Sequence, residues 1–214
     1  AGRDHRVLAS GTVDQADRLV RVLTTRDGSD ASPSMVPLLG VDDVFAPNLC
    51  TRLIAHLDAV VLVDSPSFVP DGEGGTALAT DHRLKSRLDH VIVDDDVLAV
   101  VAARLRDRLL PEVVRSFAHR PASFEVPKIV RYPAGGGVFR PHRDNVTADT
   151  AHRRLAVTIN LDRGYVGGRL RFPEVSDDSY QPNPGSAIVF SCGLLHEVTE
   201  VERSPRHALI TFLW

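Results

Sequence analysis

The 214-residue sequence has few cysteines, no long apolar run and no marked excess of either charge, and each absence excludes a class of protein. Its two cysteines, Cys50 and Cys192, are too few for a disulfide framework and lack the spacing of a metal knuckle. They favour a reducing, cytoplasmic environment. The apolar runs are too short to span a bilayer. The formal net charge of −3 gives no electrostatic reason for binding nucleic acid or an anionic membrane.

What is present is the composition of a globular domain, 43% hydrophobic and 25% charged. The length suggests one large domain, with or without a short appendage. Residues 1–34 combine a short strand pattern, a helical pattern and a polar linker. We expect them to be an N-terminal appendage or the tail of a missing neighbouring domain, and residues 35–214 to form the main domain.

The first part of that domain has helical patterns. Pro47 suits a helix start, and the apolar residues that follow it recur with the helical period. Residues 94–110 predict a second helix with acids in its first turn and arginines later, and Pro111 can open a third. Residues 64–90 show little periodicity, so we expect a long loop that covers something.

From Phe124 onward the sequence changes to short β-rich segments such as "RLAVTINL", "SAIVFS" and "HALITFLW". They are separated by turns rich in glycine and proline, for example "PAGGG" and "PEVSDDSYQPNPG". This pattern predicts a sandwich or barrel of strands. Helices followed by a β core make the predicted fold class α+β.

Three side chains in the β region suit a metal site. His142 and Asp144 are two residues apart and face the same side of an extended strand, and His196 follows a later strand, "AIVF". Two imidazoles and one carboxylate form the facial triad of non-haem iron enzymes. Arg206 opens the last, largely apolar strand, where a guanidinium needs a partner such as a carboxylate.

These motifs carry a resemblance. The stretch from "KIVRYPAGGGVFRPHRDN" through "GGRLRFPE" and "FSCGLLHEV" to "SPRHALITFLW" resembles the Fe(II)/2-oxoglutarate-dependent dioxygenases of the prolyl-hydroxylase type. The likeness covers residues 128–214 well and residues 36–127 more loosely. It implies a double-stranded β-helix, or jelly roll, over about residues 124–214, packed on N-terminal support helices. Arg206 resembles the oxygen-sensing and bacterial branches of the family, and in some bacterial chains such a domain follows a peroxiredoxin-like one.

The resemblance also implies roles for individual residues. His142, Asp144 and His196 would bind iron, and Arg206 would complete the catalytic set by pairing with the C5 carboxylate of 2-oxoglutarate. Tyr132 and Asn160 stand where relatives carry cosubstrate-binding tyrosines, and Asn160 is the shorter side chain. The implied cofactors are Fe(II), 2-oxoglutarate and O2, and the family allows ascorbate as well.

The implied reaction couples oxidative decarboxylation of 2-oxoglutarate to hydroxylation of a small-molecule or peptide substrate. A prolyl residue, another amino acid and a natural product all remain open. Because related halogenases lack the carboxylate that Asp144 supplies, a hydroxylase or desaturase is favoured. The segment 145–154 is a second candidate lid. Arg140, Arg153 and Arg154 are candidate contacts for an acidic substrate.

Two other functions fit the same residues. A zinc-dependent hydrolase could use the same three ligands, although it has no obvious need for Arg206. A non-catalytic jelly-roll binding module would need neither the metal ligands nor the arginine. The oligomeric state cannot be inferred from the sequence.

Overall fold

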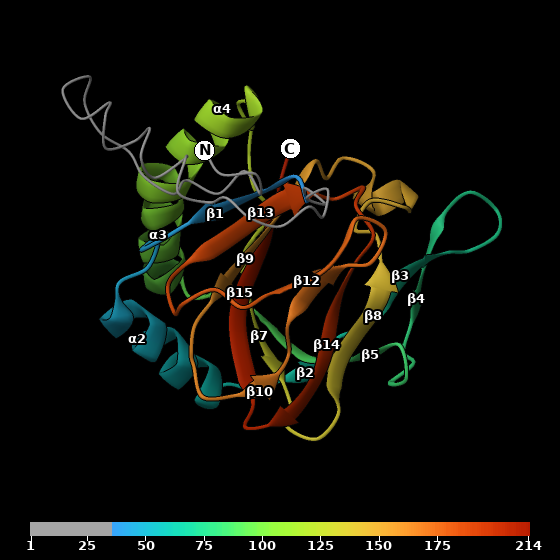
Figure 1. Cartoon of the computed structure of the whole chain (residues 1–214), viewed down its shortest axis with the longest axis horizontal. Coiled ribbons are helices and arrows are strands. Elements are labelled where there is room, and N and C mark those ends of the chain that lie inside the picture. Colours follow the sequence, from blue (N-terminus) through green and yellow to red (C-terminus); the bar gives the residue numbers. More distant parts are fainter. Residues whose placement is uncertain (1–35) are drawn as a thin grey trace, which may run out of the picture.

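The computed structural model describes residues 36–214, whose centre is a pair of antiparallel sheets that face each other (Figure 1). This arrangement is the predicted jelly roll. The predicted appendage, residues 1–34, lies outside the described residues. The larger sheet has the order β1-β13-β9-β15-β7-β6-β2, with β1 Leu38–Val41, β2 Val63–Asp64, β6 Leu88–Val91, β7 Lys128–Tyr132, β9 Leu155–Asn160, β13 Ala187–Ser191 and β15 Arg206–Leu213.

The smaller sheet lies opposite and closes the jelly roll. A separate hairpin projects on the side away from the helices (Figure 1). The smaller sheet has the order β12-β11-β14-β8-β5, and β10 also pairs with β14; the bounds are β5 Lys85–Ser86, β8 Gly137–His142, β10 Val166–Gly167, β11 Leu170–Phe172, β12 Ser176–Tyr180 and β14 His196–Arg203. The hairpin consists of β3 Ser67–Pro70 and β4 Thr76–Ala79.

Helices cover the outer face of the larger sheet (Figure 1). They are α2 Pro47–Asp58, α3 Asp95–Arg104 and α4 Leu110–Phe117. A π-helical turn, Leu105–Leu109, joins α3 to α4. Pro111 explains this turn, because proline has no N–H and its ring crowds the carbonyl four residues earlier. No helix within residues 36–214 is long and apolar enough to cross a membrane.

The alternation of side chains along β15 separates the core from the pocket. Leu209 and Leu213 point outward and pack with the helices in the main hydrophobic cluster. Arg206, Ala208, Ile210 and Phe212 face the inside of the jelly roll and line its cavity. The last strand is therefore apolar on both faces because both of its faces are covered.

Two segments expected to be loops contain strands, so those expectations were wrong. Residues 64–90 hold β3, β4, β5 and β6, and "PEVSDDSYQPNPG" contains β12. These strands have two to five residues, too few to show a clear period of two. β12 is also polar and partly exposed, as suits a strand at the edge of a sheet.

Candidate metal centre and pocket

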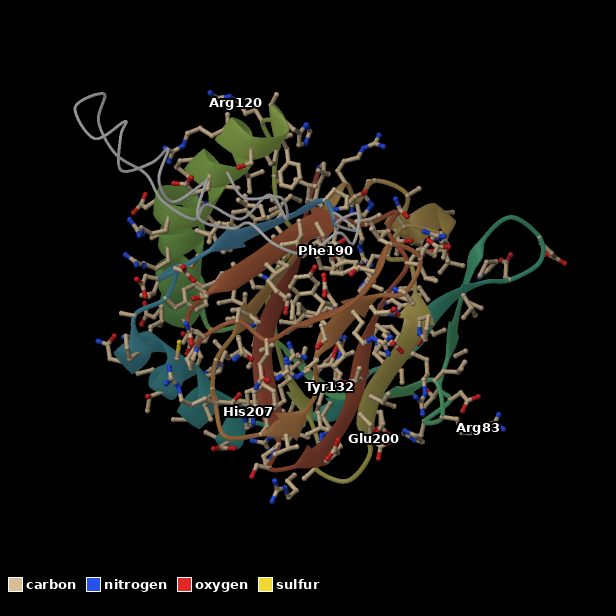
Figure 2. The ribbon with its side chains drawn as sticks, viewed as in Figure 1. Arg83, Arg120, Tyr132, Phe190, Glu200 and His207 are labelled. Atoms are coloured by element: carbon tan, nitrogen blue, oxygen red, sulfur yellow. The ribbon has the colours of Figure 1, made fainter. Side chains whose placement is uncertain are left out.

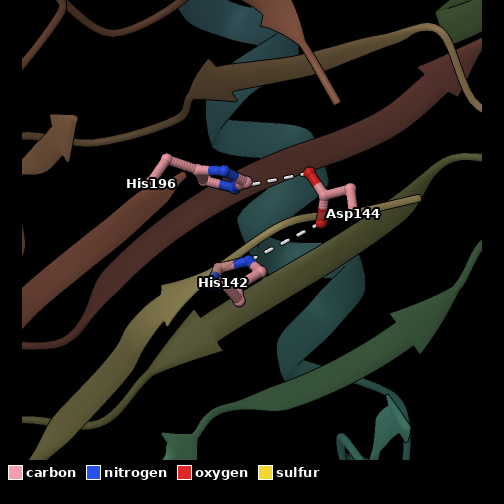
Figure 3. A group of neighbouring side chains, drawn as sticks. All are labelled: His142, Asp144 and His196. Atoms are coloured by element: carbon pink, nitrogen blue, oxygen red, sulfur yellow. Dashed lines mark ion pairs between the residues drawn. The ribbon is translucent and has the colours of Figure 1, made fainter. Parts of the chain in front are cut away.

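His142, Asp144 and His196 converge inside the jelly roll (Figure 3). β8 and β14 are neighbours, and their register places His142 opposite His196. Asp144 follows β8, where its backbone N–H donates to the carbonyl of Cys192 at 3.0 Å. The Asp144 carboxylate lies 3.6 Å from Nε2 of His142 and 3.3 Å from Nε2 of His196. One ligand atom from each residue lies within 4.8 Å of the others, close enough to hold one metal ion.

Backbone contacts fix which imidazole nitrogen faces the centre. Nδ1 of His142 lies 2.8 Å from the Arg140 carbonyl, and Nδ1 of His196 lies 3.0 Å from the Leu194 carbonyl. A carbonyl only accepts, so each Nδ1 must donate its proton, which leaves the lone pair on Nε2. Such contacts orient metal-binding histidines in general.

Aromatic rings hold the two imidazoles in place. The ring of Phe139 stacks on His142, with centroids 3.4 Å apart and an interplanar angle of 15°. Phe190 meets His196 edge to face, with centroids 4.6 Å apart. These contacts restrict the imidazole rotamers, so the donor set is ordered by the chain itself.

The electrostatics of the cluster favour the protonation states that a metal needs. Burial alone would raise the pKa of Asp144, but His196 and His142, with a smaller contribution from Arg153, outweigh it and hold that pKa below its usual range. Burial lowers the pKa of His196 to about 4; Asp144 opposes this shift and His142 adds to it. At neutral pH the cluster therefore presents a carboxylate and a neutral imidazole, the forms that bind metal ions.

Arg206 lies in the same cavity, which has a volume of about 340 Å³. Arg206 is 4% exposed, and its Nε has no hydrogen-bond partner among residues 36–214. The guanidinium carbon lies 5.1 Å from the ring centroid of Tyr132 and 6.0 Å from that of Tyr165. A buried guanidinium with an unused donor fits a ligand carboxylate, so this arginine suits one end of 2-oxoglutarate.

Tyr132 stands directly opposite Arg206 in the pairing of β7 with β15 and lies inside the molecule (Figure 2). It lines the pocket, and its hydroxyl accepts a 3.4 Å hydrogen bond from Nη1 of Arg87. Arg87 is in turn held by both oxygens of Asp89, at 2.7 and 2.8 Å, and by Ser65 at 3.1 Å. Tyr132 therefore lies beside Arg206, and its hydrogen bond to 2-oxoglutarate stays a prediction.

Asn160 is placed differently. Its amide nitrogen donates to the carbonyls of Asp162 and Pro182, at 2.6 and 3.0 Å, and its oxygen accepts from the Tyr165 hydroxyl at 3.0 Å. It does not line the cavity. Direct binding of 2-oxoglutarate by Asn160 therefore stays a prediction without support from its contacts, and its observed bonds hold Tyr165 instead.

The three arginines predicted to contact an acidic substrate have different environments. Arg140 lines the cavity, whereas the side chain of Arg153 is taken up by Glu125 at 2.5 and 2.9 Å. Arg154 does not line the cavity. Residues 66–70, which comprise β3 and the residue before it, and parts of 145–154 also line the cavity, and their role as lids stays a prediction.

Lys85, Lys128 and Phe139 are among the cavity residues that the sequence analysis did not single out. Lys85 lies in the segment expected to be a loop, and Lys128 was treated only as part of a strand. One feature of the sequence could have indicated the two lysines. Lys85 and Lys128 are the only lysines among the 25 lysine and arginine residues of the sequence.

Comparison with known proteins gives the family. The model of the 2OG-Fe(II) oxygenase superfamily matches residues 127–214. This segment is a 2OG-Fe(II) oxygenase domain. The oxygenase therefore uses Fe(II), 2-oxoglutarate and O2, and the donor set described above fits that requirement. A search of curated proteins found no match.

Solved structures share the fold of the oxygenase. A prolyl-4-hydroxylase from Pseudomonas putida is 20% identical with a TM-score of 0.59, over 82% of this chain and 91% of that one. A viral collagen prolyl hydroxylase from Paramecium Bursaria Chlorella virus-1 is 17% identical with a TM-score of 0.57, over 82% and 94%. A prolyl hydroxylase from Trichoplax adhaerens, in complex with a peptide of hypoxia inducible factor, is 13% identical with a TM-score of 0.60, over 96% and 94%.

Proposed function

We propose that this oxygenase hydroxylates a substrate in the cavity, with His142, Asp144 and His196 binding Fe(II). Arg206 binds the C5 carboxylate of 2-oxoglutarate, and Tyr132 lies beside that contact. We also propose that residues 35–214 form one oxygenase domain. The observation that carries the proposal is the unpartnered Nε of Arg206 in the cavity that also contains the three-residue cluster.

The chain contributes positioning and exclusion of water. Backbone carbonyls hold each histidine with Nε2 toward the metal, and the carboxylate of Asp144 completes one side of the site. Arg206 fixes the far end of the cosubstrate, so the reacting end is directed to the metal. When bound, iron with 2-oxoglutarate and O2 supplies the oxidising chemistry, releasing succinate and CO2 and delivering one oxygen atom to a C–H bond of the substrate.

A hydroxylase is supported over the alternatives by two features of the site. Asp144 provides the carboxylate that halogenases of this type lack. A zinc hydrolase would leave Arg206 buried without a function, at an energetic cost. Prolyl hydroxylases among the structural neighbours make a peptidyl proline one candidate substrate, beside free amino acids and natural products.

The test is an anaerobic titration. We expect Fe(II) followed by 2-oxoglutarate to produce the visible absorption band of the iron–oxoglutarate chelate, and O2 then to yield succinate. His142→Ala should lose the band, while exposed Arg83→Met should keep it; the Arg83 side chain is 91% exposed and projects from the molecular edge (Figure 2). Substrate turnover with Zn²⁺ and without O2 would instead establish the hydrolase.

A further inference from the structure

The cavity carries more positive charge than the chain neutralises. Asp144 is the one acidic residue among those that line it. Three lining arginines are neutralised by carboxylates just outside, in the pairs Arg87–Asp89, Arg143–Glu174 and Arg153–Glu125, at N–O distances of 2.7, 2.7 and 2.5 Å. Four further cations line the cavity without a carboxylate partner within residues 36–214: Lys85, Lys128, Arg140 and Arg206.

The cosubstrate accounts for one of these four. A 2-oxoglutarate molecule has two carboxylates, and under the proposed function one is held at the metal and the other by Arg206. Lys85, Lys128 and Arg140 then remain without an ion-pair partner within residues 36–214. Arg140 is exposed and Lys128 is half-buried, whereas Lys85 is buried. A buried ammonium is costly unless it is paired, so a further anionic group is expected beside Lys85.

Lys85 has the most demanding environment of the three. It is 7% exposed, and Nζ donates one hydrogen bond, to the carbonyl of Pro66 at 2.9 Å. An ammonium has three donors, so two remain. Nζ also lies 4.7 Å from the ring centroid of Phe139, the ring that stacks on His142. Lys85 is therefore separated from the candidate metal centre by a single aromatic side chain.

The choice of lysine matters in a chain that otherwise uses arginine for its basic side chains. Both lysines of the sequence line this cavity. Lysine is a compact charge that gains or loses its proton readily when buried, whereas arginine stays charged. Burial lowers the pKa of Lys85 to about 6; Arg87 and Lys128 add to that shift, and Asp89 and Asp144 oppose it. A carboxylate beside Lys85 would reverse the shift by favouring the ammonium.

We propose that the substrate of this oxygenase carries a carboxylate, which Lys85 binds beside the Phe139–His142 pair, with Lys128 and Arg140 adding positive charge around it. This inference rests on the proposed function. The proposed substrate class is an acid, and the carboxylate can belong to a small carboxylic acid or to an acidic residue of a peptide.

The first test observes Lys85 directly. Protein labelled with [ε-¹³C]lysine gives two lysine signals, assigned with Lys85→Arg and Lys128→Arg, in the complex with 2-oxoglutarate and Zn²⁺ in place of iron. The probes are acid–amide pairs: glutamate and glutamine, aspartate and asparagine, and short proline-containing peptides with Glu or Gln. We expect at least one acid to shift the Lys85 signal toward the ammonium form and its amide to leave the signal unchanged.

The second test measures function with the iron enzyme. The effective acid should accelerate succinate formation over the rate without substrate. Lys85→Met should raise the apparent dissociation constant of that acid at least about tenfold, because a hydrogen bond to a charged group is lost. The dissociation constant of 2-oxoglutarate should change less than about threefold in Lys85→Met and should rise strongly in Arg206→Met. Lys85→Arg, which keeps the charge, checks that the effect is not general misfolding. Free acids and peptides form separate arms that identify the source of the carboxylate.

Two results would overturn the inference while leaving the oxygenase function intact. In one, no acid in the panel exceeds its amide in either test. In the other, Lys85→Met weakens the binding of 2-oxoglutarate as much as Arg206→Met does, which would show that Lys85 binds the cosubstrate. A protein that forms no iron–oxoglutarate band and no succinate would contradict the proposed function itself, so the two failures are distinguishable.

Discussion

Arg206→Met should remove the stabilisation by 2-oxoglutarate while leaving the free protein about as stable as the wild type. In the free protein the Arg206 guanidinium is buried, and its Nε has no partner among the described residues. The favourable contacts found for its guanidinium are with the rings of Tyr132 and Tyr165. Methionine fills similar space without a charge to desolvate.

These contacts set the expected changes in the stability of the free protein and in the binding of 2-oxoglutarate. Two cation–π contacts at about 0.5–1 kcal/mol each are lost in the free protein. Relief of the buried charge offsets them, so we expect a net change within about 1 kcal/mol. In the complex, two hydrogen bonds to a carboxylate are lost, each worth about 1.5–3 kcal/mol. A rise in the dissociation constant of at least about 100-fold follows.

Arg87→Met is the matched control, because Arg87 is a buried arginine of the same cavity whose partners are all present. It is held by Asp89 and Ser65 and contacts the hydroxyl of Tyr132. Removing it leaves Asp89 buried without its cation, which costs about 3–5 kcal/mol. Arg206→Met should therefore weaken the binding of 2-oxoglutarate, whereas Arg87→Met should lower the stability of the free protein.

Thermal unfolding of the metal-loaded protein with and without 2-oxoglutarate is the assay. At a concentration 100 times the wild-type dissociation constant, the ligand stabilises by about 2.7 kcal/mol, and a 100-fold weaker variant retains about 0.4 kcal/mol. For a domain of this size the difference is roughly 5–10 °C in Tm. The reasoning is refuted if Arg206→Met lowers the Tm of the free protein as much as Arg87→Met, or if the 2-oxoglutarate shift survives in Arg206→Met.

Two further predictions concern the rest of the chain. Burial raises the pKa of Cys50 to about 11 and raises that of Cys192 as well, so neither thiol should react with a disulfide reagent in the native protein at neutral pH, and both should react in denaturant. Gly185→Ala should cost at least about 3 kcal/mol in denaturant unfolding, because φ is +81° and a Cβ would lie 2.0 Å from the Phe45 carbonyl oxygen. Gly164→Ala, at φ +96° but with no atom within 4 Å, should cost only about 1–2 kcal/mol, and equal losses would contradict the clash.

The β core was predictable because its strands are long enough to show their character. β9, β13 and β15 carry five to eight residues rich in β-branched and aromatic side chains, bounded by glycine and proline. The spacing of His142 and Asp144 required only that the strand be extended. That His196 lies opposite His142 depends on the register of β8 and β14, which no local pattern in the sequence contains.

The cationic side of the cavity could not be predicted in the same way. Lys85 and Arg87 lie on or beside β5, a strand of two residues whose existence depends on pairing with β8. The side chain of Asn160 faces Tyr165 because two backbone carbonyls and one hydroxyl satisfy it there. Both results arise from contacts between distant segments, so the sequence alone indicated the strand that carries Asn160 but not the neighbours of its amide.

The unpaired charges of the cavity connect stability with function. Arg87 and Arg206 have the same side chain and are both buried, yet within residues 36–214 a carboxylate pairs with the first and none with the second. Lys85 repeats this pattern, with a carbonyl and an aromatic ring around it but no carboxylate partner among the described residues. Folding would be more favourable if these charges were paired or replaced by apolar side chains. An arginine and a lysine that line one cavity without a carboxylate partner among the described residues are therefore best explained by anions that arrive with the ligands: one on 2-oxoglutarate and one on the substrate.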